Sequence, residues 1–151
     1  IDIIQPMYSL VKRQAEVELL PMASAEGMAV AAYSPLGGGL LTGKYHRGET
    51  GRLSTDQRYG ARYGQDWMRH TASALLDVSA RLNVTPATLA VAWVRRHSAI
   101  TAPIISARNV AQLRPSLAAQ SLQLSDEDYA VIEGLSPRPA PATDRLEEAA
   151  S

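Results

Sequence analysis

The sequence predicts an α/β protein built on a parallel sheet. Short apolar segments with almost no charge alternate along the chain with longer segments whose apolar residues recur at helical spacing. Strands separated by helices lie parallel, because each helix returns the chain to the same end of the sheet. With 151 residues, of which 46% are hydrophobic, the chain is long enough for one domain with a sizeable core.

Three segments are the predicted strands. Residues 1–5 (IDIIQ) and 28–34 (MAVAAYS) are short, apolar and almost uncharged, as strands buried on both faces are. Residues 101–105 (TAPII) form the third strand, in which Pro103 must occupy a position that needs no backbone N–H donor.

Helix signals fill the intervals between these strands. Leu20-Pro21 marks the start of a first helix, and Gly27 ends it. Residues 71–82 form a second helix, with one face made of Ala72, Leu75, Leu76, Ser79 and Leu82. Thr85 is an N-cap followed by Pro86, and this third helix has an inner face of Ala87, Ala90, Val91 and Val94.

Two more helix starts follow the third strand. Asn109 with Gln112, and Ser125 with Asp128, have the spacing of a capping box, and Leu124 is placed for a hydrophobic staple against Tyr129. Residues 46–66, rich in Arg, Gly and Tyr, show neither helical nor strand periodicity and are predicted to be a loop. The chain divides into an ordered portion, 1–135, and a loosely held Pro/Ala-rich tail, 136–151.

The composition narrows the possible partners and location. Fifteen basic and fifteen acidic residues give a net charge of zero, which argues against nucleic acid or a membrane surface as partner. Cysteine is absent, which suits a reducing compartment, and no stretch approaches the roughly 18 apolar residues of a membrane span. We therefore expect a cytoplasmic protein. Because the chain starts at Ile1 in apolar sequence, we expect a piece of a larger protein or a processed start.

The stretch YSPLGGGLLTGKY, residues 33–45, directly follows the second predicted strand. Parallel sheets bind ligands at the carboxyl ends of their strands, through the loops that follow. Glycines let the backbone approach a ligand and present N–H groups to an anion, and Lys44 adds a charge that can reach phosphate. The alternative is that the three glycines form only a flexible turn.

Three stretches together resemble successive blocks of the aldo-keto reductases: QPMYSLVKRQAEVELLP (5–21), AYSPLGGGLLTGKY (32–45) and PIISARNVAQL (103–113). The resemblance implies a (β/α)8 TIM barrel that reduces aldehydes and ketones with NADPH. It identifies residues 1–135 as the C-terminal part of such a barrel, about three strand–helix units. The implied partners are a small-molecule carbonyl substrate and the missing N-terminal half of the barrel.

The resemblance also implies roles for residues of the first two blocks. Gln5 matches the glutamine that hydrogen-bonds the nicotinamide carboxamide, and Tyr33 matches the aromatic residue that stacks on the nicotinamide ring. The loop that wraps the pyrophosphate matches Ser34, Pro35, Leu36, Gly37 and Gly38. Lys44 and Arg52 match basic residues near the cofactor phosphates. From the residues alone, a strand-capping Gln5, a core Tyr33 and a solvated Arg52 are the alternatives.

In the third block, Ser106, Arg108 and Gln112 match the loop and helix start that hold the 2′-phosphate and adenine. A helix N-terminus beside an arginine suits phosphate, because free N–H groups and a fork-shaped cation converge there. Relatives usually carry Glu and Asn where this chain has Pro115 and Ser116. Pro115 is therefore expected to bend the helix or to make it start one turn later, and to weaken adenine binding.

The resemblance places the catalytic Asp, Tyr, Lys and His on loops after earlier strands, so it assigns no catalytic residue within this chain. His46, His70 and His97 do not replace that group, and His97 is interpreted as a cation that compensates the dipole at a helix C-terminus. The alternative to an enzyme is a non-catalytic cofactor-binding or interaction subunit, or a truncated homologue, with the same fold. No His, Asp and Glu cluster has the spacing of a metal site.

Overall fold

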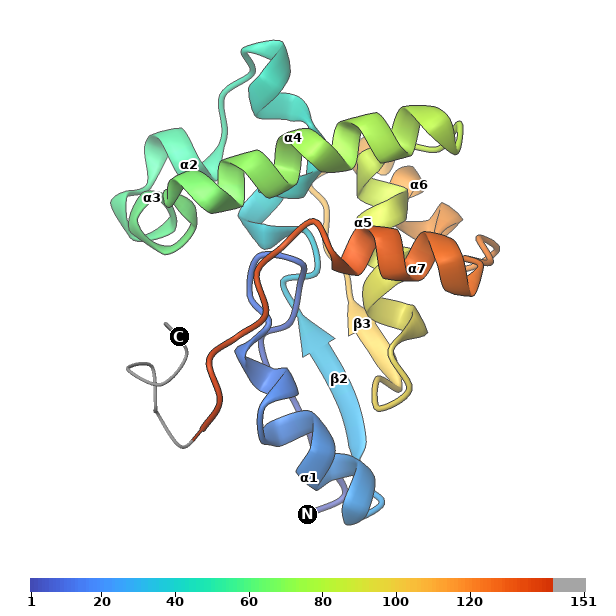
Figure 1. Ribbon diagram of the computed structural model, residues 1–151. Helices are drawn as coiled ribbons and strands as arrows, with labels where there is room; N and C mark the ends of the chain where they lie inside the picture. The colour runs from blue at the N-terminus through green and yellow to red at the C-terminus, as the bar shows by residue number, and fades with distance from the viewer. Residues whose placement is uncertain (143–151) are drawn as a thin grey trace, which may run out of the picture.

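The computed structural model describes residues 1–142, which form an α/β structure around one three-stranded parallel sheet (Figure 1). The strands β1 (Ile3–Ile4), β2 (Ala29–Tyr33) and β3 (Ala102–Ile104) lie in the order β1-β2-β3. The predicted fold class, strand–helix alternation on a parallel sheet, is confirmed. Most of the predicted tail lies outside the described residues.

The strands are shorter than the predicted segments, but their register aligns their carboxyl ends. Ile3 pairs with Ala29, and at the other side of β2, Tyr33 pairs with Ile104. Pro103 lies within β3 opposite Ala32. Within the described residues β3 has a strand neighbour on one side only, which fits the confinement of proline to such strands.

The helices that connect the strands lie largely where their capping signals predict. The described helices are α1 (Leu19–Ala25), α2 (Arg52–Thr55), α3 (Gln57–Tyr63), α4 (Asp66–Arg81), α5 (Pro86–Arg96), α6 (Val110–Ala118) and α7 (Asp126–Glu133). Three short 3₁₀ segments are η1 (Gln14–Glu16), η2 (Gly37–Thr42) and η3 (Lys44–Arg47). Gly27 follows α1 with φ of 65°, the left-handed conformation in which glycine commonly ends a helix.

The prediction of a loop over 46–66 is wrong, because that segment contains α2 and α3 and the start of α4. Asp56 caps α3 by accepting hydrogen bonds from the N–H groups of Arg58 and Tyr59 at 2.9 and 3.4 Å. Helices of four and seven residues are too short to stand alone. Tertiary contacts supply the missing stability, because Leu53 of α2 packs against the core and Tyr63 of α3 is buried in it.

The predicted N-caps are confirmed by hydrogen bonds. Thr85 Oγ1 accepts from the Thr88 N–H at 3.1 Å, and Ser125 Oγ accepts from the Asp128 N–H at 3.0 Å. The inner face predicted for α5 is too narrow. Its four residues are buried, but so is the rest of the helix from Ala87 to Val94, including Trp93.

Helix α6 starts at the predicted N-cap and not one turn later. Asn109 Oδ1 accepts from the Gln112 N–H at 3.0 Å, whereas the Gln112 side chain reaches back to the Arg108 N–H at 3.3 Å. Pro115 lies inside the helix, as expected. The Thr88 hydroxyl donates to the Pro115 carbonyl at 2.7 Å, which ties this turn of α6 to α5.

The interpretation of His97 as a dipole-compensating cation is wrong. Burial lowers the pKa of His97, and this outweighs the nearby Glu16 and Glu133 carboxylates, which favour the charged form. Its Nδ1 accepts a hydrogen bond from the Ala99 N–H at 3.2 Å, and its ring lies edge-on to Tyr8 at 5.6 Å. Burial thus favours the neutral form of the imidazole, and the ring serves the packing of the α5 C-terminus.

A buried arginine joins the two ends of the described chain. Arg13, 5% exposed, makes a two-pronged ion pair with Glu16, and its guanidinium also donates to Glu133 and Ser136. The Tyr8 hydroxyl donates to the same Glu16 carboxylate at 2.7 Å. The segment after β1 is thereby fixed against α7.

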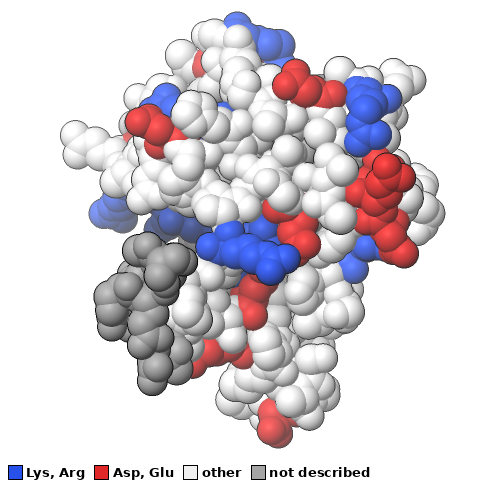
Figure 2. All heavy atoms as spheres, in the orientation of Figure 1, with Lys and Arg blue, Asp and Glu red and all other residues white. Residues whose placement is uncertain are grey.

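Charge is mixed over the surface. Figure 2 shows basic and acidic atoms interspersed on the viewed face, and over α7 the acidic atoms lie beside basic ones. None of the helices in residues 1–142 is long and apolar enough to cross a membrane. In the same residues no three His, Cys, Asp or Glu side chains come close enough to hold a metal ion.

Candidate functional site

The carboxyl ends of the three strands meet at one edge of the sheet. The chain after β1 runs along β2, because the Tyr33 N–H donates to the Pro6 carbonyl at 2.9 Å and the Tyr8 N–H donates to the Tyr33 carbonyl at 3.1 Å. Met7 and Tyr33 form an isolated parallel bridge, and Tyr33 pairs with Ile104 on its other side. Residues just beyond all three strands therefore lie at one edge.

One face of the sheet is open at this edge. Tyr33 is 37% exposed and Ile104 is 40% exposed, whereas Val30 and Ala32, which point to the other face of β2, are fully buried. Within the described residues the Tyr33 side chain is therefore partly exposed. Gln5 is also exposed, so its amide is available to a ligand.

The loop after β2 adopts an unusual backbone. Ser34 has φ of 60°, a left-handed conformation that residues other than glycine rarely adopt. Gly37, Gly38 and Gly39 have φ of 56°, 65° and 96°. The Gly37 N–H donates to the Ser34 carbonyl at 3.0 Å, closing a tight turn in which Pro35 is buried and Leu36 is half-buried. Strained conformations of this kind cluster at ligand-binding sites.

The glycines are also required by packing. A Cβ atom added to Gly38 would lie 2.9 Å from the rings of both Tyr59 and Tyr63, and one added to Gly37 would lie 2.7 Å from the Val11 side chain. Helix α3 therefore lies directly on the glycine loop. The alternative of a merely flexible turn does not fit a segment held by such close contacts.

A basic pocket lies beside this loop. Arg52 and Arg108 line a cavity of about 180 Å³ together with Thr50, Gly51 and Thr55. It brings together the segment before α2 and the loop after β3, and no acidic side chain lines it. Two guanidinium groups, two hydroxyls and a bare backbone are groups that bind an oxyanion such as phosphate.

Lys44 connects the glycine loop to this pocket. Its ammonium group contacts Gly51 so closely that a side chain there has no room, and it lies 3.3 Å from where a Cβ of Gly39 would be. It also lies 4.8 Å from the centre of the Tyr45 ring, a cation–π contact. Lys44, Arg52 and Arg108 thus surround Gly51 with three cations.

The remaining residues predicted from the third block lie in the loop after β3 and at the start of α6. Ser106, Arg108 and Gln112 are all exposed. The side-chain oxygen of Gln112 holds the Arg108 backbone, so this glutamine shapes the loop that presents the arginine. Arg52 is exposed, and its guanidinium donates to the Tyr59 hydroxyl at 3.3 Å.

Sequence reasoning missed several residues that build the site. Thr50, Gly51 and Thr55 line the basic pocket, and Tyr59 and Tyr63 cover the glycine loop. The two tyrosines stand four residues apart, the spacing of one helical face, and this was the only available signal.

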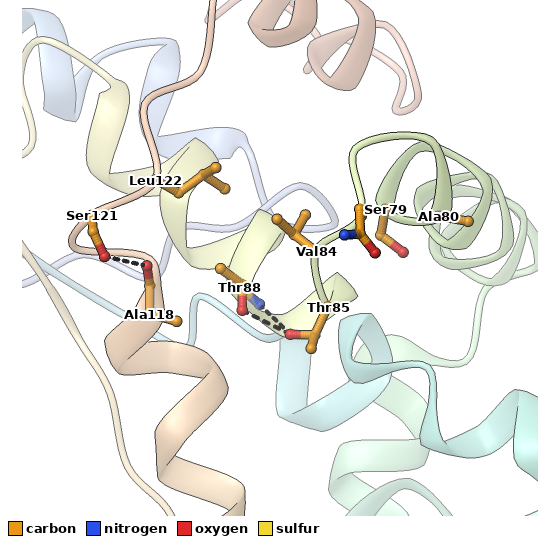
Figure 3. A pocket seen from close by; sticks show the side chains of 9 residues that line it. Ser79, Ala80, Val84, Thr85, Thr88, Ala118, Ser121 and Leu122 are labelled. Carbon is orange, nitrogen blue, oxygen red and sulfur yellow. Dashed lines mark hydrogen bonds between the residues drawn. The ribbon is translucent and has the colours of Figure 1, made fainter.

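A larger hollow lies away from these residues, between the end of α4, the start of α5 and the end of α6 (Figure 3). It measures about 660 Å³ and is lined by Ser79, Ala80, Asn83, Val84, Thr85, Thr88, Ala118, Ser121 and Leu122. Figure 3 shows Thr85 and Thr88 joined by hydrogen bonds, and their hydroxyl oxygens lie 2.7 Å apart. Its lining contains no ionisable side chain, so the carboxyl edge of the sheet is the better functional candidate.

These features define an α/β protein whose parallel sheet gathers basic side chains near its carboxyl edge, where such sheets bind their ligands. The model of the aldo/keto reductase family matches residues 1–137, and the chain belongs to that family. The family implies a (β/α)8 barrel, with which the small parallel sheet is consistent. The resemblance noted in the sequence is thereby confirmed.

Named relatives agree with this assignment. Protein tas of Escherichia coli (strain K12) is 34% identical over 134 residues, which cover 87% of this chain and 39% of that protein. The uncharacterized oxidoreductase YrpG of Bacillus subtilis (strain 168) is 35% identical, over 92% and 41% of the two chains. The NADH-specific methylglyoxal reductase of E. coli (strain K12) is 34% identical, over 87% and 41%. The chain thus spans about two fifths of these relatives' length.

Proposed function

We propose that this chain supplies the cofactor-binding part of an NADP-dependent oxidoreductase that reduces aldehydes or ketones to alcohols. The observation that carries the proposal is the arrangement at the carboxyl edge of the sheet. There an exposed Tyr33, a strained glycine loop and the pocket between Arg52 and Arg108 lie in succession. A flat ring, a pyrophosphate and a further phosphate are the parts of NADPH that such groups would hold.

Each residue type suits the part of the cofactor that it would contact. The Gln5 amide has both a donor and an acceptor for a carboxamide, and the exposed ring of Tyr33 offers a stacking surface that fixes which face of the nicotinamide is presented. The hydroxyl of Ser34 and the N–H groups of Leu36 and Gly38 suit pyrophosphate, whereas the Gly37 N–H already donates to the Ser34 carbonyl. When bound, the nicotinamide supplies the hydride that the carbonyl carbon accepts.

The proposal of NADPH rather than NADH rests on the basic pocket. Lys44, Arg52 and Arg108 gather around Gly51, and NADH carries one phosphate fewer for such a cluster to bind. NADH is the second candidate, because one relative is named an NADH-specific methylglyoxal reductase. Pro115 and Ser116 stand where relatives usually carry Glu and Asn, so contacts to the adenine are expected to be weaker.

Arg108→Ala tests the choice of cofactor. A charge-assisted phosphate contact contributes about 1.5–3 kcal/mol, so the dissociation constant of NADPH should rise roughly ten- to a hundredfold and that of NADH should stay nearly constant. Cofactor fluorescence titration measures both. Arg114→Ala is the matched control, because Arg114 is exposed on α6 and does not line the pocket. Equal weakening of both cofactors would show that Arg108 supports the loop and does not bind the extra phosphate.

The rest of the barrel is the proposed partner of this chain. Its sheet leaves β1 and β3 each with one strand neighbour in the described part, and the chain covers about two fifths of its relatives. Further strands would pair with both edges and bring the catalytic groups that this family carries on earlier loops. A non-catalytic cofactor-binding subunit remains the alternative, because the groups gathered at this edge are groups that hold a ligand.

A further inference from the structure

Helix α6 begins directly after the loop that carries Arg108, but it buries little surface of its own. Of its nine described residues only Ser116 is buried, whereas Val110 and Leu117 are exposed. A helix of nine residues is too short to be stable alone. Pro115 weakens it further, because proline has no N–H to donate within the helix. Contacts other than apolar burial must therefore hold α6 in place.

A chain of two threonine hydroxyls joins α6 to the start of α5. The Thr88 hydroxyl donates its single proton to the Pro115 carbonyl at 2.7 Å. The Thr85 hydroxyl, 2.7 Å from that of Thr88, is therefore the donor between the two threonines (Figure 3). Because Thr88 is 4% exposed, little water competes for its bond to Pro115. Both hydroxyl protons thus point from α5 towards α6.

The Pro115 carbonyl depends on this hydroxyl. One turn further along, the Ala119 N–H donates to the Ser116 carbonyl at 3.3 Å and not to Pro115, as a regular α-helix would require. A half-buried carbonyl that lacks a donor costs free energy comparable to a lost hydrogen bond. Thr88 supplies that donor, so a side chain of α5 replaces a bond that is missing from α6.

The first turn of α6 fixes the arginine of the basic pocket. The Gln112 side chain accepts from the Arg108 N–H at 3.3 Å, and the Gln112 N–H donates to the Asn109 side chain at 3.0 Å. Arg108 lines the pocket together with Arg52. Because Pro115 follows Gln112 by three residues, less than one helical turn, a shift of α6 at Pro115 also shifts Arg108.

We propose that Thr88 is a positioning residue, which holds α6 through the Pro115 carbonyl and thereby sets Arg108 where it can bind a phosphate. Thr88 itself does not line the basic pocket. The role of Arg108 in this inference rests on the proposed function, whereas the bond between Thr88 and α6 does not. Thr88 thus compensates, within this chain, for the proline that interrupts α6.

A stability measurement tests the bond. Thr88→Val should lower the melting temperature by about 2–5 °C, and Thr88→Ser, which keeps the hydroxyl, should lower it less. In a Pro115→Ala background the loss caused by Thr88→Val should fall to less than half, because α6 can then complete its own hydrogen bonds. Thr71→Val is the matched control, because the buried Thr71 hydroxyl donates at 2.8 Å to the Leu135 carbonyl, outside α6. Its loss should be the same with and without Pro115→Ala.

Amide hydrogen exchange measures the position of α6 without any ligand. The N–H groups of Gln112 and Leu113 donate to the side chain and the carbonyl of Asn109, so their exchange reports on the first turn of the helix. In Thr88→Val this exchange should accelerate by about three- to tenfold, because the helix is held less firmly. In Thr71→Val it should keep the wild-type rate.

Nucleotide titration measures the effect on the arginine. The dissociation constant of NADPH should rise by about three- to tenfold in Thr88→Val, whereas that of NADH should stay nearly constant. Thr88→Ser should restore the affinity for NADPH, and Thr71→Val should change neither constant. A purely structural role of Thr88 would not separate the two nucleotides in this way.

Two results would overturn the proposal. Wild-type exchange at Gln112 and Leu113 in Thr88→Val would mean that other contacts hold α6, such as the bond from Arg95 to the Leu122 carbonyl at 2.9 Å. Equal weakening of NADPH and NADH would mean that Thr88→Val loosens the fold and does not act through the arginine. A wild type that binds neither nucleotide would contradict the proposed function alone, because the exchange rates still decide whether Thr88 holds α6.

Discussion

At the scale of single residues, the glycine loop has two structural requirements, one on its backbone conformation and one on its packing, and glycine meets both. Its backbone turns through left-handed conformations at Gly37, Gly38 and Gly39, and its surface lies against aromatic and aliphatic side chains without room for a Cβ. The same bare backbone that a phosphate would approach from one side is therefore held in place by tyrosine rings on another. Rigidity of this kind lowers the entropy cost of binding a ligand.

The two requirements can be separated by a pair of substitutions. Gly38 and Gly27 both have φ of 65°, but a Cβ at Gly38 would lie 2.9 Å from two tyrosine rings, whereas one at Gly27 would meet nothing within 4 Å. Gly27→Ala should cost about 1 kcal/mol of unfolding free energy from backbone strain alone. Gly38→Ala should cost about 2–4 kcal/mol, because overpacking adds to the strain. Denaturant unfolding measures both, and equal losses would show that the tyrosine contacts yield freely.

At the scale of elements, the sequence predicts those helices whose ends carry their own signals. Thr85, Asn109 and Ser125 accept the expected N–H groups because a cap is a contact within one turn of chain. Helices α2 and α3 were not predicted, although Asp56 caps α3 in the same way, because one cap does not stabilise a helix of four or seven residues without tertiary contacts such as that of the buried Tyr63. The residues of the candidate site divide in the same way. The ends of the strands could be predicted from the sequence, but the proximity of Arg52 and Arg108 depends on the tertiary fold.

The end of α5 gives a prediction about pH. Because burial lowers the pKa of His97, the unfolded chain, with a pKa near the ordinary 6.5, binds a proton more readily than the folded one. The contribution of the neutral imidazole to the free energy of unfolding is therefore fully present above about pH 6.5, and it is lost as the pH falls below that value. His97→Gln should flatten the slope of unfolding free energy between about pH 7 and 5, measured by urea titration. His70→Gln, at an exposed position of α4, should keep the wild-type slope; identical slopes in all three proteins would contradict the assignment.

At the scale of the whole molecule, one face of the sheet is buried and the other is exposed. Val30 and Ala32 are buried beneath the helices, whereas Ile3, Tyr33 and Ile104 are 55%, 37% and 40% exposed. Parallel sheets are almost always covered on both faces. The open face and the unpaired sides of β1 and β3 therefore match the surface that the proposed remainder of the barrel would cover.

The same incompleteness predicts that this chain alone performs no carbonyl reduction, even where it binds nucleotide. Hydride transfer leaves an alkoxide that must be protonated as it forms, and a general acid contributes about 10²–10⁴-fold to such a step. Gln5, Tyr33 and the glycine loop are groups that orient a nicotinamide, so turnover should stay near background. NADPH oxidation with a panel of reactive aldehydes, compared with a full-length aldo-keto reductase, measures this. Activity within tenfold of the full-length enzyme would place a catalytic acid among these residues, and Tyr59 and Tyr63, beside Gly38, would be the first to substitute.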